Sequence, residues 1–113
     1  MTRLEALKKL AEKVEAGEWG QSAAWKVFGI GVTGRVERAF NGSLDAAIAL
    51  HDALLPDAPA QLTDMRPYGG SGGWLVSISW NKDKHQAANE NLARAWLLAI
   101  LRALIEKEKT DDQ

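Results

Sequence analysis

Cysteine is absent from this chain of 113 residues, and histidine occurs only twice. Without thiols the protein cannot form disulfides, thiolate zinc sites or a cysteine nucleophile. The sequence also lacks the H-E-x-x-H, G-x-S-x-G and Walker-loop motifs, which position catalytic side chains or phosphates. We therefore expect no bound metal, no cofactor and no enzymatic activity.

A strong net charge and a long apolar run are missing as well. The formal net charge is −1, so no overall field attracts a nucleic-acid polymer or an anionic membrane. The most apolar segment, 92–105, is too short to span a bilayer and is interrupted by Arg94 and Arg102. No segment has the charged-then-apolar plan of a signal peptide. These absences predict a protein without membrane or nucleic-acid partners, and the lack of cysteine fits a reducing cytosol without requiring it.

Apolar residues at helical spacing predict helices near both ends of the chain. Residues 4–14 place leucines on one face, and Ser22 can cap a short helix that stops at Gly29. The last helix is expected from 86 to about 106. Its apolar positions cover so wide an arc that it should be buried on more than one side. Residues 30–39 fit neither the helical nor the strand period.

A further helix is expected after Ser43. Asn41-Gly42 is a turn signal, and the Ser43 hydroxyl can accept a hydrogen bond from an N–H of the first helical turn. Asp45 adds negative charge near the positive end of the helix dipole. The apolar stripe of this helix is predicted to consist of Leu44, Ala47, Ile48 and Leu55.

One segment alternates as a strand does. In residues 74–80 the larger apolar side chains share one face, which carries Trp74, Val76, Ile78 and Trp80. Residues 62–66 are a weaker strand candidate, and 67–73 would join the two strands as a hairpin loop. The helices and the small sheet predict one α+β domain over 1–113, with a polar tail from about 107.

An aromatic residue followed by Ser43-Leu44-Asp45-Ala46-Ala47 and an apolar helix resembles the signature of the phage ABA sandwich domain family. These are small bacteriophage proteins, mostly of unassigned function. The first helix, the 74–80 strand and the last helix also follow the family's order. The resemblance implies an α/β/α sandwich with a small, mostly antiparallel sheet covered by helices. It also implies a phage protein that works in the cytoplasm of an infected bacterial host.

Two polar segments are candidates for ligand binding. The glycine-rich loop 69–73 lies between Tyr68 and Trp74 and could approach a phosphate or stack on a base; the alternative is a flexible hairpin tip. Residues 81–85 lead into the expected last helix, whose N-terminus favours an anion; the alternative is an exposed polar loop. The candidate ligand-binding residues are Tyr68, Gly70, Gly72, Trp74, Lys82, Lys84, His85, Asn89 and Arg94. The two loops should lie at opposite ends of the 74–80 strand, so the site lies either within one subunit or between two subunits of a dimer, which could join the loops.

His51 and the tryptophans are predicted to have mainly structural or interface roles. His51 is expected to be a partly buried imidazole with its hydrogen bonds satisfied rather than a base. Of the five tryptophans, Trp96 is assigned to the core, and Trp74 and Trp80 to the helix-covered face of the sheet. Trp19 and Trp25 exceed what the core needs, and surplus aromatic residues often serve interfaces.

Three functions are compatible with these features. The first is a non-catalytic protein that sequesters a small anionic nucleotide signal of host antiviral defence, as a sponge for a cyclic oligonucleotide or a cyclic ADP-ribose derivative. The second is an interaction protein that blocks or scaffolds a host or virion protein. The third is a minor enzyme acting through His85 or His51. A homo-oligomer is expected, by default a twofold dimer, with the last helix or 19–28 at its interface.

Overall fold

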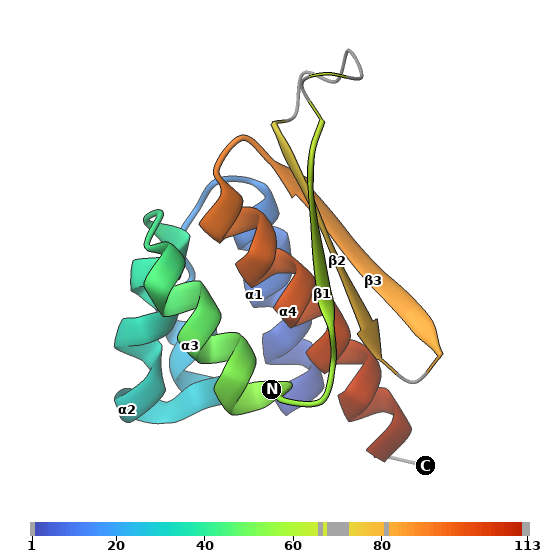
Figure 1. The fold of residues 1–113 in the computed structure, drawn as a ribbon. Helices are drawn as coiled ribbons and strands as arrows, with labels where there is room; N and C mark the ends of the chain where they lie inside the picture. The colour runs from blue at the N-terminus through green and yellow to red at the C-terminus, as the bar shows by residue number, and fades with distance from the viewer. Residues whose placement is uncertain (1, 66, 68–72, 81, 112–113) are drawn as a thin grey trace.

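The computed structural model describes residues 2–65, 67, 73–80 and 82–111. Within them the elements follow in the order α1 (Arg3–Glu15), α2 (Gln21–Phe40), α3 (Leu44–Leu54), β1 (Ala60–Asp64), β2 (Trp74–Trp80), β3 (Asp83–Asn89) and α4 (Leu92–Asp111). The class is therefore α+β, as the sequence predicts, with the strands between the third and fourth helices (Figure 1).

The three strands form an antiparallel sheet in the order β1-β2-β3. At one end of β2, Trp74 pairs with Asp64 of β1 and Asn89 of β3. At the other end, Trp80 pairs with Asp83 of β3. Directly opposite residues share a face of a sheet, so this register decides which side chains of β1 and β3 meet the helices.

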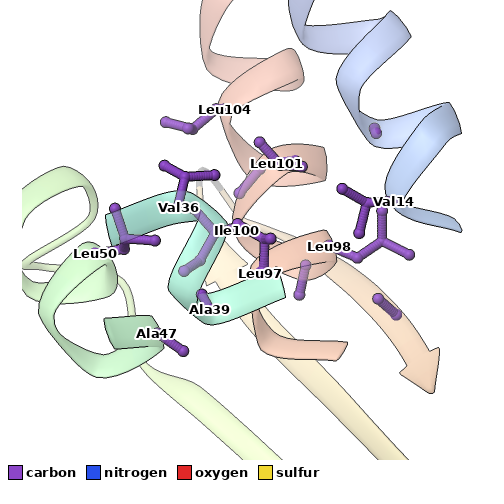
Figure 2. Close-up of a cluster of buried hydrophobic side chains, with 14 of the residues drawn as sticks. Val14, Val36, Ala39, Ala47, Leu50, Leu97, Leu98, Ile100, Leu101 and Leu104 are labelled. Atoms are coloured by element: carbon purple, nitrogen blue, oxygen red, sulfur yellow. The ribbon is translucent and has the colours of Figure 1, made fainter. Parts of the chain in front are cut away.

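Helix α4 lies at the centre of the molecule. It packs against β2 and β3 and also contacts α1, α2 and α3. Leu97, Ile100 and Leu101 are almost completely buried, and Figure 2 shows them among side chains of the other helices. This arrangement confirms that the last helix is buried on more than one side.

The helices lie on one side of the sheet (Figure 1). Val76 and Ile78 of β2 are buried on this side, where they join the same apolar core as the helices. On the opposite face, Gln86 and Ala88 of β3 are exposed. The sheet covered by helices is thus present, with the helices stacked in successive layers behind one face.

The segment before α4 differs from the prediction. The sequence predicts that residues 86–89 begin the last helix, but they belong to β3, and α4 starts only at Leu92. Gln86, Ala87 and Ala88 are good helix formers, so local propensity favours a helix here. Pairing with β2 overrides it, because Ala87 opposite Val76 is then buried in the core.

Residues 30–39, which fit neither period in the sequence, are helical and belong to α2. This helix bends at Gly29, whose backbone is not helical (φ 71°, ψ −178°), and continues to Phe40. The predicted stop at Gly29 is therefore a kink between two helical segments. The predicted cap by Ser22 is wrong, because the N-cap position is Gly20, and no side chain caps this helix.

Helix α3 begins where predicted but turns a different face inward. The Ser43 hydroxyl accepts a hydrogen bond from the Ala46 N–H at 3.2 Å, which confirms the cap. Leu44 and Ile48 of the predicted stripe are each 40% exposed. The buried positions of the helix are Ala46, Ala47, Leu50 and His51. In the described part of the chain, no helix is both long and apolar enough to cross a membrane.

Candidate functional site

The structure divides the residues that the sequence singles out for binding. Three of them, Tyr68, Gly70 and Gly72, lie outside the described residues. Trp74, Asn89 and Arg94 lie at the end of the sheet where β3 leads into α4, whereas Lys82, Lys84 and His85 lie at the β2–β3 turn. Seven residues of β2 separate the two groups, roughly 20 Å at the usual rise per residue.

The N-terminus of α4 is not open to a ligand in the way the sequence suggests. The Asn91 side chain accepts a hydrogen bond from the Arg94 N–H at 3.1 Å and so caps the helix. The Asn89 side chain accepts from the Asn91 N–H at 2.9 Å. The prediction that Lys82, Lys84 and His85 directly precede this helix terminus is wrong. Lys82 precedes β3, Lys84 and His85 lie at its start, and the rest of β3 separates all three from α4.

Arg94 is engaged in joining two helices. Its Nε donates to the Phe40 carbonyl oxygen at 2.9 Å, and its guanidinium carbon lies 4.1 Å from the centroid of the Phe40 ring. A cation over an aromatic face is attracted by the ring quadrupole. Arg94 thus holds the end of α2 against the start of α4.

The contacts of His51 confirm the prediction that its imidazole is buried with its hydrogen bonds satisfied. The residue is 7% exposed, and its Nε2 lies 2.6 Å from the Ala58 carbonyl oxygen. The indole Nε1 of Trp96 donates to the His51 Nδ1 at 3.0 Å. Because an indole N–H can only donate, the His51 Nδ1 is the acceptor of this bond, and Nε2 donates to the Ala58 carbonyl oxygen. Both ring nitrogens therefore have partners inside the core.

His85 lies beside Trp80 near the β2–β3 turn. The two ring centroids are 6.5 Å apart, and the half-buried His85 has an Nε2 without a hydrogen-bond partner among the described residues. Lys82 and Lys84 are exposed. These three residues remain together, but at a surface turn instead of a helix terminus.

A cavity that the sequence does not predict lies between α1 and the start of α2. Its volume is about 510 Å³, which falls within the range of small-molecule sites. The cavity is lined by Lys9, Lys13, Trp19, Gly20, Gln21, Ser22, Ala23 and Lys26. We call it the α1–α2 cavity.

Close packing at Gly20 shapes this cavity. A Cβ atom at Gly20 would lie 2.7 Å from the Lys13 Cδ and 3.4 Å from the Leu10 Cδ1. The lack of a side chain therefore lets the start of α2 approach α1 closely. This approach brings lysines of both helices to the same hollow.

The α1–α2 cavity favours an anion. Lys9 and Lys26 are exposed, and the Lys13 ammonium lies 4.0 Å from the Glu18 carboxylate. The first turn of α2 contains no acidic residue and has no side-chain cap, so its backbone N–H groups add positive potential. The other described helices begin with side-chain caps from Thr2, Ser43 and Asn91.

Trp19 provides an aromatic surface in the same cavity. The ring is half-buried and lies against Phe40, with the centroids 5.5 Å apart and the planes tilted by 40°. The sequence assigns the aromatic ring to Trp74 and the cations to 81–85, at opposite ends of one strand. The structure brings a flat ring and several cations together at Trp19.

The signal for the α1–α2 cavity is weak in the sequence. Lys9 and Lys13 fit the solvated face of an amphipathic helix, which is where most such lysines lie. The helix start gives no clear signal either, because Ser22 is the N-cap that the sequence predicts. Only the structure shows that the helix begins after Gly20 without a side-chain cap from that position, close to those lysines.

Comparison of the chain with known protein families, with curated proteins and with solved structures finds no significant match. The resemblance to the phage ABA sandwich domain family therefore stays a prediction. The function of the protein has to be inferred from its fold and from the α1–α2 cavity.

Proposed function

We propose that the protein binds a small anionic nucleotide in the α1–α2 cavity and does not transform it. The observation that carries this proposal is the gathering of Lys9, Lys13 and Lys26 around a hollow that Trp19 also lines. Ammonium groups bind phosphate as point charges, and an aromatic ring offers a surface on which a base can stack.

Binding without reaction is supported by the positions of the two histidines. Both nitrogens of His51 are hydrogen-bonded within the core. His85 lies on β3, which is not among the elements that line the α1–α2 cavity. Among the described residues, those that line the cavity include cations, an amide and a hydroxyl, but no carboxylate or imidazole that would serve as a general base.

The family resemblance adds a biological setting to this proposal. In a phage protein, the bound nucleotide would be a signal of host antiviral defence, such as a cyclic oligonucleotide or a cyclic ADP-ribose derivative. Sequestering it in the cytoplasm of the infected bacterium would silence the signal. This setting depends on the resemblance, whereas the anionic ligand depends on the cavity.

Thermal unfolding with a panel of nucleotides tests the proposal. A ligand that binds only the folded state raises the midpoint of unfolding, so at least one nucleotide should do so. The bound nucleotide should be recovered intact after the protein is denatured. Recovery of a cleaved product would contradict binding without reaction, and a flat response to the whole panel would contradict the nucleotide ligand.

Lysine variants test the location. Lys9→Gln and Lys26→Gln should each weaken nucleotide binding by about 1 kcal/mol, between the values of an exposed ion pair and of a hydrogen bond to a charged group. Affinity should also fall with added salt, because counterions screen exposed charges. Titration calorimetry at two salt concentrations measures both effects.

Lys84→Gln is the matched control, since it removes the same charge from an exposed position on β3. It should leave the affinity unchanged. If Lys84→Gln weakens binding while Lys9→Gln and Lys26→Gln do not, the ligand binds at the β2–β3 turn, as the sequence alone suggests.

The second candidate function is an interaction protein. Trp25, on the first segment of α2, is 51% exposed, and exposed tryptophan is enriched at protein interfaces. This candidate gains support if the protein fails to respond to nucleotides and Trp25→Ser abolishes capture of a host or virion protein.

A further inference from the structure

We propose that Trp19 selects ligands that carry a flat ring, and that Arg94 is a positioning residue that holds Trp19 through Phe40. This inference rests on the proposed function, because it concerns the same α1–α2 cavity. It goes further in naming the part of the ligand that is recognised and a residue outside the cavity on which recognition depends.

The three side chains form a continuous stack. Trp19 contacts the ring of Phe40 at a centroid distance of 5.5 Å, and the guanidinium of Arg94 lies 4.1 Å from the centroid of that ring. Phe40 is only 6% exposed. Trp19 lines the cavity, whereas Arg94 does not, so the stack runs from the cavity into the junction of α2 and α4.

Packing, not hydrogen bonding, orients the Trp19 ring. Its Nε1 is buried and has no hydrogen-bond partner among the described residues. A buried indole N–H usually finds an acceptor, which then fixes the ring plane. Because Trp19 lacks this restraint, the orientation of its ring depends on the Phe40 surface behind it.

Arg94 restrains that surface by two different interactions. The Nε–H of Arg94 is bonded to the Phe40 carbonyl oxygen, across 54 positions of the sequence, and its guanidinium group covers the Phe40 ring. The backbone and the side chain of Phe40 are thus both held. Loss of Arg94 should let Phe40, and with it Trp19, occupy more than one orientation.

The lysines and Trp19 should recognise different parts of the ligand. The lysines attract any small phosphate, with or without a ring. The Trp19 ring adds affinity only for a ligand with a flat π-system, since stacking requires two such surfaces. The cavity should therefore prefer a nucleoside phosphate to a sugar phosphate of the same charge.

AMP and ribose 5-phosphate are the probes, because they share the phosphate and the sugar and differ in the base. The unmodified protein should bind AMP roughly 5- to 150-fold more tightly, the range expected for stacking of one base. Trp19→Ala should lower AMP affinity to that of ribose 5-phosphate and leave ribose 5-phosphate binding unchanged. Trp19→Phe, which keeps an aromatic ring and should fold more readily than Trp19→Ala, should retain most of the preference.

Arg94→Gln tests the positioning role. It should reduce the preference for AMP severalfold without changing ribose 5-phosphate affinity, and Arg94→Lys should restore part of the preference because it keeps a cation near Phe40. A purely structural role would instead lower both affinities together. Lys9→Gln is the reference variant, since it should weaken both probes equally.

The outcomes separate this inference from the proposed function. Equal binding of AMP and ribose 5-phosphate by the unmodified protein would overturn the role of Trp19 while leaving the anion site intact. A parallel loss of both probes in Trp19→Phe and Arg94→Gln would overturn the selective stack. Failure of both probes to bind the unmodified protein at low salt would overturn this inference, and a flat response to the whole nucleotide panel would overturn the proposed function as well.

Discussion

At the scale of single residues, Ser43 decides where α3 begins. Its hydroxyl accepts from the Ala46 N–H, one of the donors that a helix start leaves without an intrahelical partner. Ser43→Ala should therefore lower the free energy of unfolding by about 1 kcal/mol. Urea unfolding measures the change, and nucleotide binding in the α1–α2 cavity should be unaffected.

Ser22→Ala is the control for this prediction. Ser22 lies in the first turn of α2, and the sequence predicts that it caps this helix, but no side chain does so. Its replacement should change the stability much less than Ser43→Ala. Coinciding urea midpoints for Ser43→Ala and the unmodified protein would show that the cap contributes nothing.

At the scale of elements, α2 contains a glycine that the kink requires. Gly29 has a φ of 71° and a ψ of −178°, a region almost closed to residues with a Cβ. Gly29→Ala should therefore destabilise the protein by about 1–3 kcal/mol, although no atom of the described residues, apart from the chain neighbours and the nearby backbone of the same helix, lies within 4 Å of the added methyl group. Thermal or urea unfolding measures the loss.

Gly34 provides the matched substitution in the same helix. An added methyl group would meet open space there too, and the φ of Gly34 is not positive. Gly34→Ala should stabilise the protein by about 0.5–1 kcal/mol, because alanine loses less backbone freedom in a helix. Equal effects of the two substitutions would show that the kink is not a strict backbone requirement.

The helices and strands differ in how well the sequence predicts them. The Ser43 cap, the 74–80 strand and the burial of α4 on several sides all follow from local rules and from hydrophobic period. β3 does not, because Ala87 becomes a strand residue only through pairing with Val76. The α1–α2 cavity cannot be predicted for a similar reason: Lys9 and Lys26 lie on different helices, and tertiary packing, close at Gly20, brings these helices together.

At the scale of the whole molecule, the central position of α4 bears on oligomerisation. The apolar circumference of this helix suggests a partner subunit, but α1, α2, α3 and the sheet cover it within one chain. The other predicted interface is the first segment of α2, where Trp25 is 51% exposed. Light scattering at micromolar concentration should give a dimer mass for the unmodified protein and a monomer mass for Trp25→Ser.

A monomer mass for the unmodified protein would contradict the expected dimer. If both the unmodified protein and Trp25→Ser give a dimer mass, the interface lies elsewhere. The exposed face of the sheet, which carries Gln86 and Ala88, would then be the next surface to vary.

The place of α4 in the chain also has a consequence for biosynthesis. This helix follows every other described element, and each of the remaining helices contacts it. A nascent chain that ends before Leu92 can form its helices and pair its strands, but it has no common surface on which to bury them. Since ribosomes add roughly 5–20 residues per second, the emerging segments stay exposed for seconds before the core can close. Chaperones and proteases would therefore find these segments accessible until α4 is available to pack against them.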